Sequence, residues 1–373
     1  MGNIGYHKGN NMLYRHTIFT ATLGLLLLTA PVLQVKADTL PDPDGKPADM
    51  SRPVKVFVLM GQSNMLGAGK INPSKKKAGG SLTEAVKEKG LYRYLVDDNG
   101  NWTVRKDVRN VRVMGSGTGP MKVFNNEWMT IKGRSIGPEI GIGHYLGHAT
   151  DAPVLILKSC IGNRSLGWDL LPPGSERYEV EEKDKKTGEM KTFVYAGYKD
   201  SPNKWEKGTE PEPIGWYAGK QYDGDIARTK QVLAELGKYY PDANKYEVAG
   251  FFFWQGDKDR YNAAHAGRYE QNLVHFIRQL REDFNAPNAK FVCATLGQTK
   301  KGAEGNEGLI LDAMFAVDGR SGKYPEFKGN VATVYTNPVS MGGSSNGHYG
   351  GNAETYMNVG EAMGKAMVEL LGR

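Results

Sequence analysis

Short apolar runs alternate with segments of helical periodicity along most of the chain. The first run, 54–60, is rich in β-branched residues and is typical of a buried strand. Similar runs follow at 154–157, 251–254, 291–296 and 331–335. Helical patterns lie between or after them, opening at 136–139 and covering 223–239, 261–284 and 352–371. Fully apolar strands separated by helices indicate parallel pairing, so we expect an α/β domain with a doubly wound sheet and helices on both faces.

Two polar stretches interrupt this alternation. Residues 70–110 read as a surface excursion that ends in a short strand or hairpin. Residues 174–215 are the least compact part of the chain, and within them 178–198 alternates about a turn at 186–189. We interpret 174–215 as an insertion with an exposed hairpin, carried by a single domain that covers 53–373.

The first 37 residues have the layout of a secretory signal peptide. Lys8 and Arg15 precede an apolar stretch of about 16 residues, which is shorter than the roughly 20 needed to cross a bilayer. Val35-Lys36-Ala37 is a small-x-small type of cleavage site, which predicts cleavage near Ala37. A proline- and charge-rich lead-in follows at 38–52. We therefore expect a secreted or periplasmic protein with no membrane span in its mature form.

Composition narrows the possible partners only slightly. Of the 373 residues, 39% are hydrophobic and 24% are charged, as in an ordinary globular protein. The formal net charge of +7 falls to +4 when the leader cations Lys8, Arg15 and Lys36 are removed. No zinc-finger spacing or basic helix indicates nucleic-acid binding. Cys160 and Cys293 fall in or beside different predicted strands, which favours two buried thiols over a disulfide.

The five residues Gly61-Gln62-Ser63-Asn64-Met65, directly after the first strand, are the strongest chemical signal. A glycine permits a tight turn at the strand end, and it leaves Ser63 at the carboxyl edge of the sheet, where ligands of such folds bind. Ser63 is therefore a candidate nucleophile. The alternative is that Ser63 only caps the following helix.

Two later segments fall at the same sheet edge and supply partners for a nucleophile. Trp254-Gln255-Gly256-Asp257-Lys258-Asp259 follows the strand at 251–254, and Gly347-His348-Tyr349 lies between the last strand and the last helix. A serine needs a base to remove its proton, and histidine is the natural base near neutral pH. The other histidines beyond the leader lie on predicted helices, where packing or surface roles are expected: His144, His148, His265 and His275. No third ligand accompanies His144 and His148, so no metal site is predicted.

Together these segments resemble the SGNH hydrolases, above all carbohydrate esterase family six and the sialate O-acetylesterase-like proteins. The resemblance rests on the first motif, on Gly137-Pro138-Glu139, on Trp254-Gln255-Gly256-Asp257 and on His348, and it extends from about 54 to 371 except for the insertion. It implies a flavodoxin-like doubly wound fold of the SGNH type. It also implies a serine esterase that needs no cofactor.

The resemblance assigns roles to these residues. Ser63 would be the nucleophile and His348 the general base and then acid. The oxyanion would be bound by the backbone N–H groups of Ser63 and Gly137 and by the side-chain amide of Gln255. Asn64 would contact the substrate or hold the turn through local hydrogen bonds.

The acid of the triad departs from the family pattern. SGNH enzymes commonly place an aspartate three residues before the histidine, where this chain has Ser345. Related esterases often have a glutamate after Gln-Gly, and this chain has Asp257 there. We predict that Asp257 orients His348, with Asp259 as the alternative acid. Two other possibilities are that Asp257 only caps a helix, and that the site is a Ser–His dyad helped by a backbone carbonyl.

The segment 161–168 leaves the second strand edge and is expected to line the cleft. Trp168 would stack on a sugar ring and Arg164 would bind a hydroxyl or carboxylate, although Trp168 could equally cap the core. The sequence thus predicts a secreted esterase that removes O-acetyl groups from a poly- or oligosaccharide through an acetyl-serine. A degenerate carbohydrate-binding protein and a lipase or thioesterase on the same fold are the alternatives. The glycan and the oligomeric state are not indicated.

Overall fold

The computed structural model describes residues 40–41, 43, 45–73, 80–114, 120–184 and 187–373. The predicted leader lies outside these residues. In the described part of the chain, no helix combines the length and apolarity that crossing a membrane requires.

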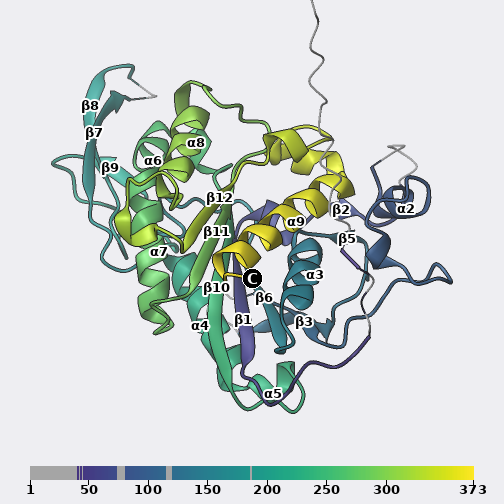
Figure 1. Cartoon of the computed structure of the whole chain (residues 1–373). Helices are drawn as coiled ribbons and strands as arrows, with labels where there is room; N and C mark the ends of the chain where they lie inside the picture. The colour runs from purple at the N-terminus through teal and green to yellow at the C-terminus, as the bar shows by residue number, and fades with distance from the viewer. Residues whose placement is uncertain (1–39, 42, 44, 74–79, 115–119, 185–186) are drawn as a thin grey trace, which may run out of the picture. The chain divides into compact units, whose positions relative to one another are not determined.

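A seven-stranded sheet forms the centre of the fold (Figure 1). Its strands in spatial order are β12 (Val331–Val334), β11 (Lys290–Ala294), β10 (Tyr246–Trp254), β1 (Val54–Gly61), β6 (Val154–Ser159), β3 (Val108–Met114) and β4 (Lys122–Trp128). Neighbouring strands pair in parallel except for β3 and β4, which are antiparallel. The carboxyl ends of the six parallel strands therefore share one edge, which is where β1, β6 and β10 deliver the candidate site.

Alternate side chains of β1 enter two different hydrophobic cores. Val56 and Val58 pack in a cluster with α4 (Lys220–Ala234), α7 (Tyr269–Asp283) and α8 (Gly305–Val317). Phe57 and Leu59 pack in a second cluster with α3 (Glu139–Ala149) and α9 (Ala353–Leu370). Figure 1 shows α3 and α9 together on the near face of the sheet. Burial on both faces explains why the strands read as unbroken apolar runs.

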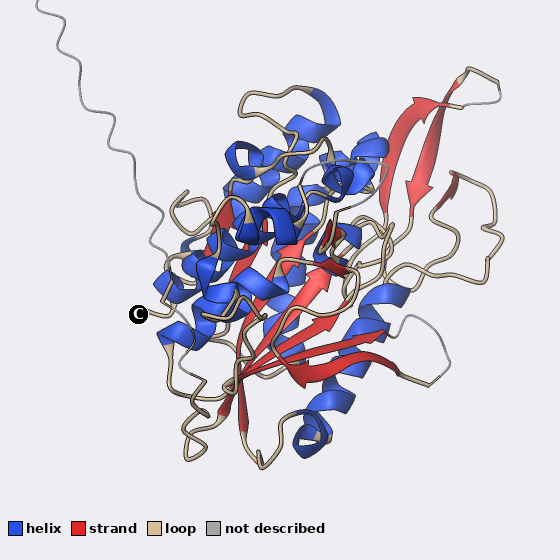
Figure 2. Cartoon of the chain, turned by 90° about the vertical axis from the view of Figure 1, so that its right-hand side faces the viewer, coloured by secondary structure: helices blue, strands red, loops and turns tan. Residues whose placement is uncertain are grey.

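The remaining elements are short or lie outside the central sheet. The helical ones are α1 (Ser63–Leu66), α2 (Leu82–Lys87), α5 (Leu236–Tyr239), α6 (Ala263–Gly267), η1 (Arg93–Leu95), η2 (Asp259–Tyr261), η3 (Pro325–Phe327), η4 (Asn337–Val339) and η5 (Ser345–Gly351). Two strands, β2 (Gly69–Lys70) and β5 (Ser135–Ile136), form a small ladder. The predicted insertion contains β7 (Tyr178–Lys183), β8 (Met190–Tyr195) and β9 (Lys204–Glu206), a separate antiparallel sheet that extends away from the central one (Figure 2).

Most predicted elements are present, but several differ from the expectation, and β4 was not anticipated. The excursion at 70–110 ends in β3, which is a largely buried strand of the central sheet and not a surface strand. The helix expected at 261–284 is broken into η2, α6 and α7, and α8 was not anticipated. Both cysteines are buried and free, as the sequence favoured.

Candidate active site

Ser63 lies just beyond the carboxyl end of β1. Gly61 ends the strand with a φ of 137°, and a Cβ at this position would collide with the backbone carbonyl of Trp254. Glycine is therefore required where β1 turns against β10. α1 begins at Ser63, whose side chain is partly exposed and whose Oγ enters none of the hydrogen bonds found among the described residues. The hydroxyl is presented freely at the sheet edge.

The loop after β6 lies directly against this serine. We call residues 160–168 the β6 loop. A Cβ built on Gly162 would stand 3.4 Å from the Cβ of Ser63, an ordinary van der Waals contact. Among the described residues, the backbone N–H groups of Gly162 and Ser63 have no hydrogen-bond acceptor. Ser63 and the adjacent Gly162 thus each have a free N–H donor, and the sequence analysis did not assign the one of Gly162.

Gln255, at the end of β10, is a buried junction between these segments. Its Nε2 donates to the side-chain oxygen of Gln62 at 3.2 Å, to the carbonyl of Arg164 at 2.8 Å and to Asp259 at 2.6 Å. Its Oε1 accepts a bond of 2.8 Å from the Tyr269 hydroxyl. The amide of Gln255, which was predicted to bind the oxyanion, therefore connects the turn that carries Ser63 to the β6 loop.

Gly137, the other predicted oxyanion donor, has its N–H engaged. It donates to Glu139 Oε1 at 3.0 Å, while Glu139 Oε2 accepts from the buried ammonium of Lys158 on β6. Lys158 also donates to the carbonyl of Leu66, the last residue of α1, at 3.0 Å. This buried ion pair fixes the far end of the Ser63 turn, a role that the sequence analysis did not foresee.

Asn64 and Tyr356 join the loop that carries His348 to the Ser63 turn. Asn64 Nδ2 donates to the carbonyl of Ser345 at 3.4 Å, three residues before the histidine. The hydroxyl of Tyr356 contacts both Asn64 Oδ1, at 3.4 Å, and the carbonyl of His348, at 3.5 Å. The structure thus joins the Ser63 turn and the histidine loop through Asn64, whose bonds are long-range and not the local ones expected from the sequence.

The backbone of the histidine loop has an unusual conformation. His348 and Tyr349 both have φ of 51°, in the left-handed region that side chains disfavour. Tyr349 is fully buried, its ring stacks on Trp254 with centroids 5.7 Å apart, and its hydroxyl accepts the N–H of Gly297 at 3.0 Å. These contacts offset the strain and set the direction of the half-buried imidazole of His348.

Asp257 lies beside the histidine loop. Its Oδ1 accepts from the hydroxyl of Ser345 and from Arg260 Nε, the latter at 2.9 Å. Asp257, three residues beyond the end of β10, therefore bonds to the residue three positions before His348. No bond joins Asp257 to the imidazole in the described contacts, so its role as the orienting acid stays a prediction.

Asp259, the alternative acid, has its oxygens directed elsewhere. Oδ2 accepts from the N–H of Leu166 at 2.9 Å and Oδ1 from the N–H of Gly167 at 2.8 Å, in addition to the bond from Gln255. The side chain is completely buried, and this burial raises its pKa to about 6. Asp259 thus holds the β6 loop, and none of its described bonds goes to His348.

The predicted substrate residues lie further along the β6 loop. The Arg164 guanidinium is 4.4 Å from the ring centroid of Trp216 and 3.9 Å from Asp169. Trp168 packs partly against a small cluster that includes Leu171. Both side chains are partly exposed, so each packs against the protein and also presents surface to solvent.

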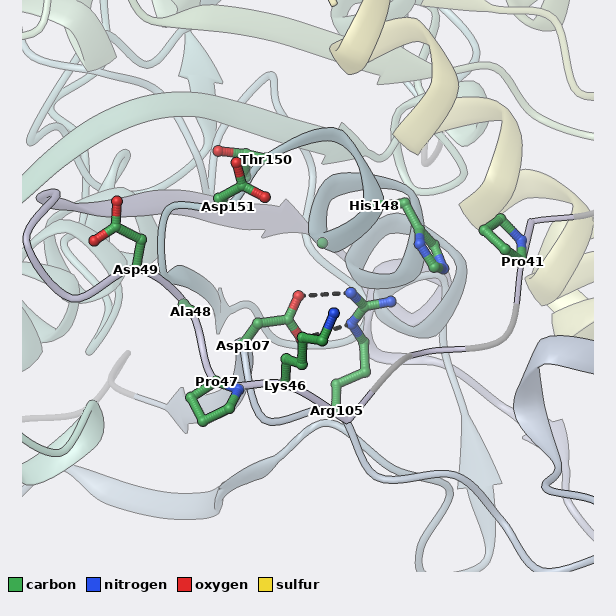
Figure 3. A pocket seen from close by; sticks show the side chains of 11 residues that line it. Pro41, Lys46, Pro47, Ala48, Asp49, Arg105, Asp107, His148, Thr150 and Asp151 are labelled. Carbon is green, nitrogen blue, oxygen red and sulfur yellow. Dashed lines mark hydrogen bonds and ion pairs between the residues drawn. The ribbon is translucent and has the colours of Figure 1, made fainter.

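A pocket of about 590 Å³ lies at the opposite edge of the sheet, where β3 and β6 begin (Figure 3). Arg105 forms two bonds with Asp107 on its wall, at 2.9 and 2.6 Å. None of the predicted site residues lines it. The described residues also contain no group of three or more potential metal-binding side chains of the histidine, cysteine or acidic type.

The arrangement around Ser63 can support acyl transfer. It combines a free hydroxyl, a histidine loop tied to the same turn, and backbone donors beside the serine. Gly162 could have been found from sequence because, like Gly61 and Gly256, it follows an apolar strand within a few residues. The links made by Lys158 and Tyr349 depend on tertiary contacts and had no comparable signal.

Comparison with known families supports the resemblance seen in the motifs. Residues 195–369 match the family model described as "Carbohydrate esterase, sialic acid-specific acetylesterase". The match covers slightly less than half of the chain and includes Gln255, Asp257 and His348, but it does not reach Ser63. The chain thus resembles the carbohydrate esterases of this type. No curated protein sequence matches it.

Several solved structures are similar in part. A protein from Arabidopsis thaliana is 15% identical with a TM-score of 0.45, and the alignment covers 85% of this chain and 99% of that one. A carbohydrate acetylesterase from Xanthomonas citri is 13% identical with a TM-score of 0.46, over 86% of this chain but only 57% of the other. NanS is 12% identical with a TM-score of 0.38, over 78% and 79% of the two chains.

Proposed function

We propose that this protein is a serine esterase that removes O-acetyl groups from a carbohydrate. The observation that carries the proposal is the set of contacts joining the Ser63 turn to the His348 loop through Asn64 and Tyr356. The match of residues 195–369 to a carbohydrate esterase family supports the substrate class. We further propose that the sheet is doubly wound in the SGNH manner, which the strand order and the two covered faces support.

In the first half of the reaction, Ser63 Oγ attacks the acetyl carbonyl carbon while His348 removes its proton. The tetrahedral intermediate collapses when His348 returns that proton to the sugar oxygen, which leaves as an alcohol. The acetyl group is then bound to Ser63 as an ester. In the second half, His348 takes a proton from water while the water oxygen attacks the carbonyl carbon of the acetyl-serine. The second tetrahedral intermediate collapses when His348 returns that proton to Ser63 Oγ, which restores the serine hydroxyl and releases the acetyl group as acetic acid, which ionises to acetate.

The oxyanion needs preorganised donors, each of which typically contributes about 3 kcal/mol of transition-state stabilisation. The N–H of Ser63 keeps the role predicted for it, and we propose the N–H of Gly162, a residue that lies against Ser63, as the second donor. Gly137 and Gln255 were the other predicted donors. Their bonds to Glu139 and to three acceptors favour a positioning role, in which they hold the Ser63 turn and the β6 loop.

We propose Asp257 as the acid that acts on His348. Its bond with Ser345 puts a carboxylate against the loop that carries His348. Asp259 is less suitable because its oxygens already bind two backbone N–H groups and Gln255. A Ser–His dyad remains the mechanism if Asp257 contributes nothing.

The substrate in this proposal is an acetylated poly- or oligosaccharide. Arg164 and Trp168 on the β6 loop would contact the sugar, and the leader at 1–37 would direct the protein to the periplasm or outside the cell. A non-catalytic carbohydrate-binding protein is the second candidate, favoured by Ser345 at the position where related enzymes have an aspartate.

Acetate release from a panel of acetylated polysaccharides tests the proposal, with the Ser63→Ala protein as the control. We expect release from at least one glycan and none from the variant. Equal release by both proteins, or binding without release by either, would contradict the esterase proposal. A preference for long acyl chains on p-nitrophenyl esters would favour a lipase instead.

A further inference from the structure

We propose that Asp259 is a positioning residue that holds the β6 loop beside Ser63 and releases it when protonated. The proposal rests on the proposed function only for its effect on catalysis. Its structural part concerns the loop alone and can be tested in a chain without activity.

The geometry around Asp259 shows what it holds. Its two oxygens accept the N–H groups of Leu166 and Gly167, which lie four and five residues after Gly162. No other side chain in the described residues accepts these two backbone donors. Gly167 also lets the loop approach closely, because a Cβ there would collide with the imidazole of His265. The carboxylate is thus the main polar anchor of the loop that brings Gly162 to the serine.

Asp259 also connects the loop to the nucleophile. Gln255 donates to Asp259 and to Gln62, and Gln62 additionally accepts the N–H of Lys258 at 3.2 Å. Because Gln62 immediately precedes Ser63, a change at Asp259 passes to the serine through two side-chain amides. A loss of this anchor should therefore alter both walls of the site.

A proton on Asp259 would have no acceptor among the groups that are hydrogen-bonded to its oxygens. The groups bonded to its oxygens, the N–H groups of Leu166 and Gly167 and the amide of Gln255, are all donors. Protonation turns one acceptor oxygen into a donor, so at least one of these bonds must weaken. Nδ1 of His265 lies 4.0 Å from Oδ1 and is a potential acceptor for that proton.

His265 itself stays neutral at moderate acidity. Its Nε2 contacts the Asn203 side-chain oxygen at 3.1 Å, which places the ring proton on Nε2 and leaves Nδ1 as an acceptor. Burial lowers the pKa of His265 to about 4, and the nearby Lys204 and Lys258 act in the same direction. Protonated Asp259 would therefore turn toward this neutral ring and away from the loop.

The remaining charged neighbour favours proton uptake. Asp169, on the short segment after the β6 loop, is a like charge that adds to the effect of burial on the pKa of Asp259. Tyr178 on β7 and Tyr269 on α7 also face the site, and their phenols stay neutral because burial raises their pKa values. With a pKa of about 6, Asp259 gains its proton as the pH falls through that value. The loop is then expected to be held above about pH 6 and loosened below it.

Amide hydrogen exchange of the full chain with Ser63→Ala tests this directly, because that protein is inactive under the proposed function. We expect the protection factors of Leu166 and Gly167, corrected for intrinsic pH effects, to fall about tenfold or more between pH 7.5 and pH 5. Adding Asp259→Asn should give low protection at both pH values. Asp318→Asn is the matched control, since Asp318 is also buried and accepts a backbone N–H, from Thr333 at 2.8 Å, but lies away from the loop.

Protection of the two amides that is independent of pH, or unchanged by Asp259→Asn, would overturn the proposal. If Asp259→Asn does not fold, the pH dependence of the Asp259-containing chain decides, with amides of β10 as the internal reference that should not change. In the active protein, kcat should fall below pH 6 more steeply than in the Asp259→Asn variant. Absence of any esterase activity would refute the proposed function and leave the exchange result to decide the role of Asp259.

Discussion

The two loops that meet at Ser63 are anchored by different kinds of interaction. The β6 loop is held by a buried carboxylate, Asp259, whose oxygens bind Leu166 and Gly167. The histidine loop is held by a buried aromatic side chain, Tyr349, which stacks on Trp254. The first anchor carries an ionisable group with a raised pKa, whereas the phenol of the second stays neutral because burial raises its pKa as well.

This difference indicates which of the two loop anchors responds to pH. Gly162, the second donor that we propose for the oxyanion, lies on a loop held by a carboxylate whose pKa is raised to about 6. The proposed base, His348, lies on a loop held by aromatic packing, which does not depend on pH and which fixes a left-handed backbone at His348. The five predictions below probe the comparison, starting with the residue on which both loops converge.

Ser63→Ala should have the largest effect. Removing Oγ deletes the acyl acceptor while leaving both loop anchors in place, so kcat for acetate release should fall by about 10⁵-fold or more. Steady-state kinetics on an acetylated glycan measures this. Ser175→Ala, in the insertion, is the control and should retain full activity. Retention of more than a small fraction of activity in Ser63→Ala would remove the nucleophile from the account.

His348→Asn should come next. Asparagine tolerates the left-handed backbone at this position, so the loop is preserved while the base is lost. We expect kcat to fall by about 10⁴-fold with circular dichroism and melting temperature little changed. His275→Asn serves as the matched control because His275 lies on α7, where its ring contacts the carbonyl of Pro173. Similar losses in both variants would point to general destabilisation.

Asp257→Asn should lower kcat by about 10² to 10³-fold, because the carboxylate would no longer stabilise the imidazolium. The same change at Asp259 should cost only about tenfold at pH 8, since that carboxylate positions a loop. Parallel kinetics of the two variants separate the acid from the anchor. A larger loss for Asp259→Asn would reverse their roles, and no loss for Asp257→Asn would favour a dyad.

Asp225→Asn should change stability instead of rate. Asp225 on α4 accepts from Ser159 at the end of β6 and is fully buried, which raises its pKa to about 7. A raised pKa means that ionisation disfavours the folded state, so the cost grows as the pH rises from about 4 to 7 and is complete above 7. The variant should therefore gain about 1–3 kcal/mol of unfolding free energy at pH 8 and almost none at pH 4.

Denaturant unfolding of Asp225→Asn and the parent chain at both pH values measures this difference. The reverse pattern, with a gain at pH 4 only, would show that the carboxylate stabilises the fold in its ionised form. The same experiment on Asp318→Asn should give the opposite sign, because bonds from Arg320 and Thr333 hold the pKa of Asp318 below its usual value.

Tyr349→Phe should have the smallest effect. It removes only the bond from Gly297 and keeps the stacking on Trp254, so stability should fall by about 1 kcal/mol and kcat by a few-fold at most. The loss should be the same at pH 5 and pH 8, unlike that of the charged anchors. A pH-dependent loss would show that the aromatic anchor is coupled to a titrating group.

Much of the fold could be predicted because its strands are apolar on both faces. β1 and β10 stand out in the sequence for that reason, and Gly61 at the end of β1 indicated the turn that carries Ser63. β3 was harder to recognise as a central strand because Arg109 and Asn110 interrupt it. Arg109 is nonetheless buried, where it donates to the carbonyl of Tyr239 at 2.8 Å, a partner 130 residues away.

The site divides in the same way. Ser63 was predicted from a motif at a strand end and His348 from the loop between the last strand and the last helix, and the structure brings these two segments together. The separate tasks of Asp257 and Asp259 could not be predicted, because two aspartates with one residue between them reach different loops. Which loop each one reaches depends on the turn of η2 and on partners about 90 residues away.

Intact-mass and peptide analysis after treatment with a fluorophosphonate tests the central claim most directly. The account predicts one phosphonyl group per chain, on Ser63, formed much more slowly in His348→Asn and absent in Ser63→Ala. Labelling of a different serine, or labelling of Ser63 at the same rate without the His348 imidazole, would contradict it.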